Sequence, residues 1–341
     1  MTLRRLRTPL VTLAAMIAAG FGLASPATAD EQNPSDDPAT PVTHEVSHSE
    51  LENAREFWTK ERMENATPMD MPAASGDEQQ DPGSLDETEP PIVEPAVPAV
   101  SPPAEQPPGT NANGTETENA PVPNTVGRLF FTAQNPDGTL GTGSCTASTT
   151  AAGGGSKIIT AGHCVHAGDN QTWYSDFVFA PAYYQGETPH GLWFGERAGT
   201  FNGWASSGNT DWDQAIIQVE RQPSGTIVET LGGNGLIGGS GPDVPGNRIW
   251  GYPGQAPFDG ELPYYCDGDA TGTEASSDSQ MACGMNQGAS GGPWLKDHIN
   301  ADLGYTWAVT SRCEAKNDDE CLGTKLFATP NPREIFNLAN I

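Results

Sequence analysis

Short apolar runs separated by polar stretches fill the C-terminal two-thirds of the chain, from Val126 onward. The intervening stretches are rich in Gly, Asn and Asp, a pattern typical of short β-strands joined by turns. Asn135–Gly138 has the composition of a hairpin turn, and in this part of the chain only Pro332–Leu338 has the spacing of a helix. The apolar runs are Leu129–Thr132, Lys157–Thr160, Phe177–Phe179, Gln214–Val219, Arg248–Tyr252 and Trp307–Val309. We therefore expect an all-β barrel or sandwich domain over residues 125–341, ending in a short helix.

A different periodicity precedes this domain, between about residues 47 and 66. Apolar residues recur there at helical intervals, and either Ser47 or Ser49 is suited to cap the start of a helix. The upstream residues 30–44 are polar and acidic and show no periodicity. One short helix has too little apolar surface to form a domain, so we expect it to dock on another part of the chain or to form only transiently.

Residues 67–124 are rich in Pro, Glu, Thr and Ala and contain repeated Pro-Pro pairs. This composition predicts a disordered or polyproline-like linker. Residues 30–124 thus form an acidic segment in which a linker ties the docking helix to the β domain. The arrangement is similar to a pro-segment ahead of an exported enzyme, and the alternative is a plain surface stalk.

Residues 1–29 have the three parts of a secretory signal peptide. Three arginines within Arg4–Arg7 form a positive start, Leu10–Leu23 is apolar, and Ala27–Ala29 is a small-residue cleavage site. The apolar run is too short for a transmembrane helix, which is the alternative interpretation. We therefore expect a secreted, extracellular protein without stable membrane association.

The formal net charge is −28, and residues 30–125, with 21 acids and 3 bases, contribute −18 of it. Few cations are available to replace the counterions of a nucleic acid or an anionic membrane, so neither is an expected partner. The six cysteines include no CxxC pair. In an exported chain this even number indicates disulfides rather than a structural zinc site, although six cysteines allow 15 pairings. We expect no metal ion and no cofactor.

One serine in the β domain is a candidate nucleophile. Ser290 lies between glycines in the uncharged stretch Asn286–Trp294. Glycines let the backbone curl so that its N–H groups converge on one point, as the oxyanion formed by attack on a carbonyl requires. A serine also needs a neighbouring base to take its proton. The alternative is a glycine-rich surface turn.

The candidate base is His163, which lies shortly after the end of the predicted strand Lys157–Thr160. A strand end holds an imidazole rigidly. A bridge from the adjacent Cys164 to Cys145 would close a loop of about 20 residues and add ~3 kcal/mol of stability in the chain-entropy model. The alternative for His163 is a hydrogen-bonded core histidine.

The candidate acid precedes the predicted strand Gln214–Val219, where Asp211 and Asp213 both occur. A carboxylate that accepts the imidazole N–H fixes the tautomer and stabilises the imidazolium. We favour Asp213, because it lies at the start of the apolar run, where a carboxylate is held and partly buried. The alternative is that both are turn residues.

The motifs around His163, Asp213 and Ser290, in that order along the chain, resemble those of the chymotrypsin-like serine peptidases. The acidic exported form and Gly251–Pro253 are most similar to the secreted bacterial branch near the glutamyl endopeptidases (V8-like). The resemblance covers about residues 126–341. It implies an all-β fold of two antiparallel Greek-key β-barrels with a C-terminal helix.

The resemblance also implies residue roles. Ser290 would be the nucleophile, His163 the general base and then acid, and Asp213 its partner. The N–H groups of Gly288 and Ser290 would form the oxyanion hole. The implied substrate pocket is Gly284, Met285, Thr310 and Ser311, and the implied disulfides are Cys145–Cys164, Cys266–Cys283 and Cys313–Cys321.

The sequence departs from the family pattern at three places. Ala289 replaces the Asp that pairs with a new N-terminus in animal members, so that activation switch is absent. Gly284 replaces the Asp of trypsin-like members, and Val309 and Thr310 supply no His as in glutamyl endopeptidases. Neither an Arg or Lys preference nor a Glu preference is therefore indicated.

Three functions fit these observations. The first is a secreted serine endopeptidase, made as a proenzyme and monomeric, whose partners are protein or peptide substrates and its own pro-segment. The second is a catalytically weak or inactive protease-like binding or adhesion protein, although such proteins usually lack one of the three residues. The third is a hydrolase of esters with the same site.

Overall fold

The computed structural model describes residues 37–72, 92–93, 108–111, 120–134, 139–273, 277–298, 303–317 and 320–341. The predicted signal peptide 1–29, most of the predicted linker 67–124 and the predicted turn Asn135–Gly138 lie outside the described residues. No helix in the described ranges is both long and apolar enough to cross a membrane.

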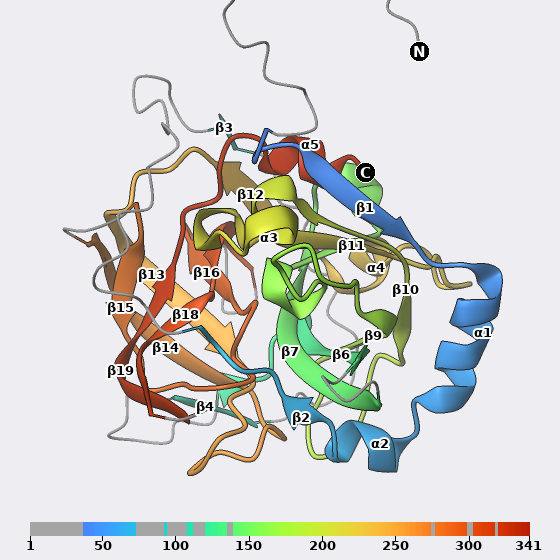
Figure 1. The fold of residues 1–341 in the computed structure, drawn as a ribbon. Coiled ribbons are helices and arrows are strands. Elements are labelled where there is room, and N and C mark those ends of the chain that lie inside the picture. The colour runs from blue at the N-terminus through green and yellow to red at the C-terminus, as the bar shows by residue number, and fades with distance from the viewer. Residues whose placement is uncertain are drawn as a thin grey trace, which may run out of the picture. The chain divides into compact units, whose positions relative to one another are not determined.

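The first half of the β domain is a closed barrel of six antiparallel strands (Figure 1). Its strands are β6 (Val126–Gln134), β7 (Leu140–Thr150), β8 (Lys157–Thr160), β9 (Ser175–Pro181), β10 (Trp193–Phe201) and β11 (Ala215–Val219). The order around the barrel is β9, β6, β7, β8, β11, β10, and pairing of β10 with β9 closes it. Because β9 returns to lie beside β6, the first four strands form a Greek key.

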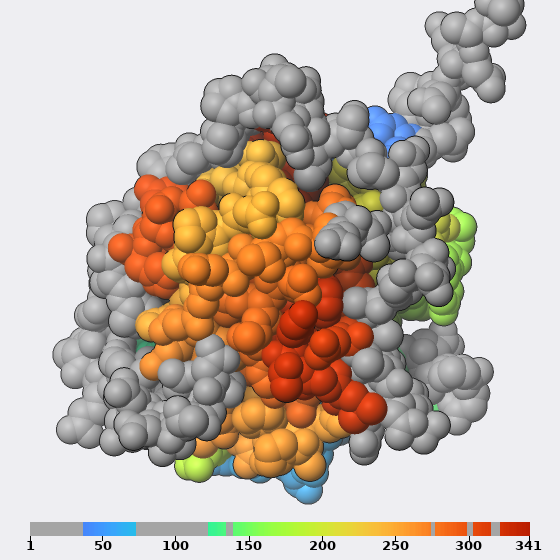
Figure 2. Space-filling view, turned by 90° about the vertical axis from the view of Figure 1, so that its left-hand side faces the viewer, coloured from blue at the N-terminus to red at the C-terminus, as the bar shows by residue number. Residues whose placement is uncertain are grey.

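The second half is an open half-barrel. Its main strands are β12 (Gly235–Gly238), β13 (Val244–Gly251), β14 (Tyr264–Gly272), β15 (Ser279–Ala282), β16 (Pro293–Lys296), β17 (Tyr305–Val309), β18 (Arg312–Asn317) and β19 (Glu320–Ala328). The sheet runs β18, β19, β15, β14, β13, β16, β17, β12, so β16 lies beside β13 in a second Greek key. Short strands β3 (Ile92–Val93), β4 (Pro108–Asn111) and β5 (Ala120–Pro121) add to it. Figure 2 shows the orange and red surface of this half.

Each half is built on its own apolar cluster. In the first barrel β8 is buried along its whole length, and Ile158 and Ile216 pack with Phe179. In the second half Trp294 and Trp307 lie edge to face, with ring centroids 5.7 Å apart, and both are fully buried. Aromatic side chains of this size supply much of the apolar area that a barrel core must bury.

The six predicted apolar runs all overlap observed strands, and the predicted C-terminal helix is α5 (Ile335–Ala339). The expectation that no other helix follows Val126 is wrong. The structure also has α3 (Asn202–Ser207) and α4 (Ile227–Leu231). The signal for α4 is a capping box, in which Thr226 and Glu229 bond to each other's backbone N–H groups.

Residues 37–72 pack on the β domain, and all but the last few of them contact the first barrel. Strand β1 (Pro41–Glu45) pairs antiparallel with β10, although its sequence has no strand periodicity. The segment predicted as one helix is two helices, α1 (His48–Phe57) and α2 (Lys60–Glu64), and Ser47 caps the first through a capping box. Figure 1 shows this blue segment alongside the barrel, followed by β2 (Thr67–Pro68).

The helices dock through a few buried side chains. Trp58, between α1 and α2, is 4% exposed and packs against Phe130 of β6, with ring centroids 5.5 Å apart. Its indole N–H donates to the backbone carbonyl of Asp176 at 2.6 Å. Ala54 and Met63 are buried in the same cluster. The short amphipathic segment is therefore stabilised by the barrel surface rather than by its own hydrogen bonds.

Candidate active site

His163 lies in a 3-10 turn, Gly162–Cys164, immediately after β8. The next residue, Cys164, is bridged to Cys145 of β7 with a Cα–Cα distance of 6.2 Å. The histidine is thus held by a buried strand on one side and by a covalent link on the other. Its side chain is 7% exposed.

Asp213, which lies just before β11, contacts both the imidazole and the backbone N–H of His163. The imidazole Nδ1 lies 2.8 Å from Asp213 Oδ2, and the backbone N–H of His163 donates to Oδ1 at 2.7 Å. The carboxylate is fully buried. A carboxylate at Nδ1 favours the tautomer with its proton there, which leaves the Nε2 lone pair free to act as a base.

A third donor reaches the same carboxylate. The hydroxyl of Ser311 donates to Asp213 Oδ2 at 2.6 Å, across the junction between the two halves of the domain. Ser311 was expected to line the substrate pocket and instead positions the acid. The sequence carries no local signal for this contact, because the two residues are 98 positions apart.

Asp211, the alternative acid, points elsewhere. Its carboxylate accepts a hydrogen bond from Ser277 at 3.2 Å. Burial and the nearby charge of Asp278 raise the pKa of Asp211 above its ordinary value. Of the two aspartates, Asp213 is the one that the structure pairs with His163.

Ser290 lies at the junction of the two halves. Its carbonyl accepts a hydrogen bond from Thr146 N–H at 2.8 Å, and the next residue, Gly291, donates to the Thr310 carbonyl at 2.8 Å. Gly291 has φ of 77°, and a Cβ there would lie 2.2 Å from Thr160 Oγ1. Only glycine fits this approach, which brings the serine loop against the strand end that leads to His163.

The two reactive atoms are enclosed. Ser290 Oγ and His163 Nε2 are both buried, and neither has a hydrogen-bond partner among the described residues. Ser290 is 0% exposed. A buried hydroxyl and a buried imidazole nitrogen without partners are costly in a fold and are typical of functional sites.

Gly288, the predicted oxyanion donor, has φ of 91°, in the region that favours glycine. Its carbonyl accepts from Thr146 Oγ1 at 2.9 Å, which fixes the direction of this turn. Its N–H donates to the carbonyl oxygen of Met69 at 3.1 Å. In this structure the Gly288 N–H is therefore occupied by the carbonyl of Met69.

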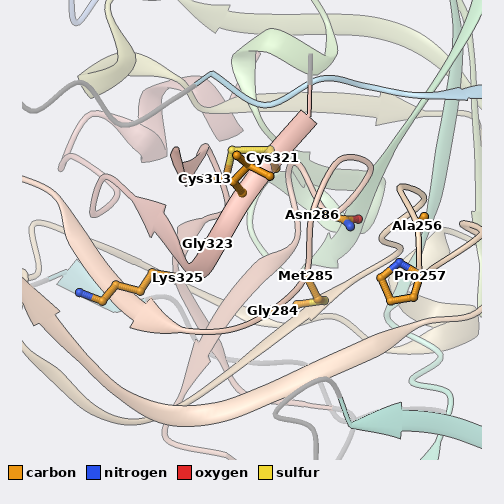
Figure 3. A pocket seen from close by; sticks show the side chains of 10 residues that line it. Ala256, Pro257, Gly284, Met285, Asn286, Cys313, Cys321, Gly323 and Lys325 are labelled. Carbon is orange, nitrogen blue, oxygen red and sulfur yellow. A yellow bond between two sulfur atoms is a disulfide. The ribbon is translucent and has the colours of Figure 1, made fainter. Parts of the chain in front are cut away.

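A cavity of about 210 Å³ lies beside this loop (Figure 3). Gly284 and Met285 line it, and Thr310 and Ser311 are not among its described lining residues. Thr310 accepts the indole N–H of Trp294 at 3.0 Å. The remaining lining residues are Ala256, Pro257, Asn286, Cys313, Cys321, Leu322, Gly323 and Lys325.

The cavity wall carries little charge. Figure 3 shows the Cys313–Cys321 disulfide on one side and Asn286 and Met285 on another. The ammonium group of Lys325 donates to Gln280 at 3.0 Å. The described lining residues include Lys325 and no acid, so they offer no counter-charge to a cationic side chain.

The cysteines do not form a metal site. Cys145, His163 and Cys164 have ligand atoms within 4.8 Å of one another, but the two sulfurs are joined and cannot act as thiolates. The structure also contains the disulfides Cys266–Cys283 and Cys313–Cys321, as the family resemblance implies.

The solved structures to which this chain is similar include two proteases. The thermostable serine protease AL20 from an extremophilic microorganism aligns with a TM-score of 0.55 and 30% identity, over 64% of this chain and 96% of that protein. The protease Anisep from Arthrobacter nicotinovorans aligns with a TM-score of 0.56 and 27% identity, over 64% of this chain and 95% of that protein.

The other comparisons are more limited. The extracellular metalloprotease of Bacillus subtilis strain 168 is 31% identical over 70 residues, which is 20% of this chain and 22% of that protein. The chain therefore spans about a fifth of the length of this curated relative. No family model matches the chain.

Fold and site together define a two-barrel hydrolase whose candidate nucleophile is a serine. The match to AL20 covers nearly all of that enzyme. The chain belongs to the chymotrypsin-like serine peptidases.

Proposed function

We propose that this protein is a secreted serine endopeptidase that cleaves peptide bonds through an acyl-enzyme on Ser290 and is made as a proenzyme. The observation that carries the proposal is the chain of hydrogen bonds from Ser311 through Asp213 to His163, together with the close approach of the Ser290 loop, at Gly291, to the end of β8. In a serine hydrolase, a buried acid holds the histidine that takes the proton of the serine nucleophile.

In the proposed reaction, Ser290 Oγ attacks the substrate carbonyl while His163 Nε2 takes its proton. Asp213 holds the imidazole tautomer and stabilises the imidazolium. The oxyanion is bound by the backbone N–H groups of Gly288 and Ser290. His163 then donates the proton to the leaving amine, and water repeats the sequence to release the acid.

Two backbone hydrogen bonds favour peptides over simple esters as substrates. The cleft already holds an extended peptide, because the N–H of Gly288 and that of Cys313 bond to the carbonyls of Met69 and Pro72. Recognition through the backbone of an extended chain is what an endopeptidase requires and what a small ester does not use. It also favours an open peptide cleft over a purely adhesive surface.

The test is labelling with an active-site fluorophosphonate. We expect the label on Ser290 and hydrolysis of casein by the processed protein, and loss of both in Ser290→Ala. Ser224→Ala, at an exposed serine, is the matched control and should behave as the parent. A processed protein that neither takes the label nor cuts casein would refute the proposal. Ester turnover without amide turnover would favour the third function.

Secretion and processing form the second part of the proposal. The signal-like residues 1–29 and three disulfides support an extracellular protein. We expect mass spectrometry of culture medium to find chains that lack residues 1–29 and are cut somewhere within 67–127. An intact, fully active chain from residue 30 to 341 would contradict the proenzyme.

A further inference from the structure

The segment from Ala66 to Pro72 lies along the catalytic cleft and is held mainly through its backbone. Residues Thr67 and Pro68 (β2) pair in parallel with Gly143 and Ser144 of β7, and the Met69 N–H donates to the Ser144 carbonyl at 2.8 Å. At the start of the segment, the buried guanidinium of Arg128 donates to the Ala66 carbonyl at 3.3 Å. These contacts attach the segment to the first barrel.

The middle of the segment covers the oxyanion donor. The Met69 carbonyl accepts from Gly288 N–H at 3.1 Å. The next side chain, Asp70, accepts from Gln287 Nε2 at 2.9 Å. A substrate carbonyl has to reach the same N–H of Gly288 to be activated, so Met69 and a substrate compete for it.

The end of the segment lies on the second half of the domain. Met71 is 0% exposed and belongs to the same apolar cluster as Met285 and Cys313. The Pro72 carbonyl accepts from Cys313 N–H of β18 at 3.2 Å. Figure 1 shows the blue chain after β2 passing from β7 toward β18.

The direction of this path is opposite to that of a productive substrate. His163 must protonate the leaving amine, so the substrate residues after the cut bond lie on the His163 side. That side is the first barrel, where Ser144 is next to Cys145 and its disulfide to Cys164. The residues before the cut bond then lie on the β18 side. The segment instead begins at β7 and ends at β18.

We infer that Ala66–Pro72 is a built-in inhibitor that binds the cleft in reverse, so that it blocks the site and is not cut by it. The inference rests on the proposed function, because that function defines the productive direction. If Met69 were acylated in place, the leaving nitrogen of Asp70 would lie toward β18, away from His163 Nε2. No proton donor would reach that nitrogen, so the bond from Met69 to Asp70 would not break, and the tetrahedral adduct would expel Ser290 Oγ and return the intact peptide.

The first test measures access to Ser290 in the uncut chain. A fluorophosphonate should label the full-length band at least ten-fold more slowly than processed protein from which residues 37–72 have been separated. Met71→Glu, which places a charge in the apolar cluster, should raise labelling of the full-length band at least ten-fold. Glu56→Gln, an exposed change in α1, is the control and should leave it unchanged. If Met71→Glu does not fold, Met71→Ala should give a smaller acceleration in the same direction.

These outcomes separate the inference from the proposed function. Equal labelling of the uncut and processed chains, or no acceleration in either Met71 variant, would overturn the inference and leave the peptidase in place. Failure of every form to label would instead overturn the peptidase.

The second test concerns direction. The concentrated full chain is incubated and its peptide bonds are mapped by mass spectrometry. We expect the bonds between Ala66 and Pro72 to remain intact in the parent, as they do in Ser290→Ala. Cleavage within this segment in the parent but not in Ser290→Ala would show that it binds as a substrate, and the reverse orientation would be wrong.

Discussion

The hydroxyl of Ser311 offers a sharp test of how the site is held together. It donates to Asp213 Oδ2 at 2.6 Å, and both residues are at most 2% exposed. Ser311→Ala removes one of three donors to a buried carboxylate and lets no water in. A hydrogen bond to a charged group contributes about 1.5–3 kcal/mol, so we expect the free energy of unfolding to fall by about 2 kcal/mol.

Ser279 provides the matched control, because it is equally buried and its hydroxyl donates to a neutral acceptor, the Pro242 carbonyl, at 2.8 Å. Ser279→Ala should cost about 1 kcal/mol. Both are measured by urea denaturation in a Ser290→Ala background, where autolysis cannot occur. For a domain of this size, the Ser311 variant should melt about 4–8 °C below its parent.

In the active background the kinetic effect should be confined to kcat. If the whole 2 kcal/mol entered the barrier, kcat would fall by about 30-fold, which is the upper limit. KM should not change, because the hydroxyl points to Asp213 and not into the cavity. Equal stability losses in the two serine variants, together with an unchanged kcat, would refute the role assigned to Ser311.

Two further predictions concern docking and pH. Trp58→Ala should weaken the hold of residues 37–72 by about 3–5 kcal/mol, because it removes a buried indole, and limited proteolysis in the Ser290→Ala background should then degrade that segment first. Resistance equal to that of the parent would contradict this. Burial lowers the pKa of Lys157 to about 8 in the folded chain. Between pH 8 and 9.5 the unfolded chain therefore holds more protons than the folded one, and the free energy of unfolding should rise with pH. In Lys157→Met that rise should be smaller, and identical slopes in the two proteins would show that Lys157 is not responsible.

The elements that can be predicted best from the sequence are those whose buried positions carry large apolar side chains. Strands β8 and β11 are short Ile-rich runs, and both were placed within a residue of their observed ends. Strand β7 escaped prediction although eight of its residues are buried, because its buried positions are mostly Ser, Thr and Ala. Their hydroxyls are satisfied by distant carbonyls, as when Thr149 donates to Gly232 at 2.9 Å, and only the fold brings these together.

In the candidate site, too, some residues can be predicted from the sequence and others cannot. His163 and Asp213 could be placed because each lies at the end of an apolar strand, and Ser290 because of its glycines. The position of the segment Ala66–Pro72 could not be predicted, since the segment is held mainly through backbone groups that every residue has. The resemblance alone placed Ser311 in the pocket, and its contact with Asp213 spans 98 positions, so no local pattern in the sequence records it.

The pairing of β1 with β10 changes what a cut in the linker accomplishes. Severing the chain after residue 72 leaves residues 37–72 attached by a strand ladder and by buried Trp58. The molecule then becomes a two-chain complex, and its separation depends on concentration rather than on covalent connection. For the proposed proenzyme, dilution would then separate residues 37–72 from the β domain with no further bond broken.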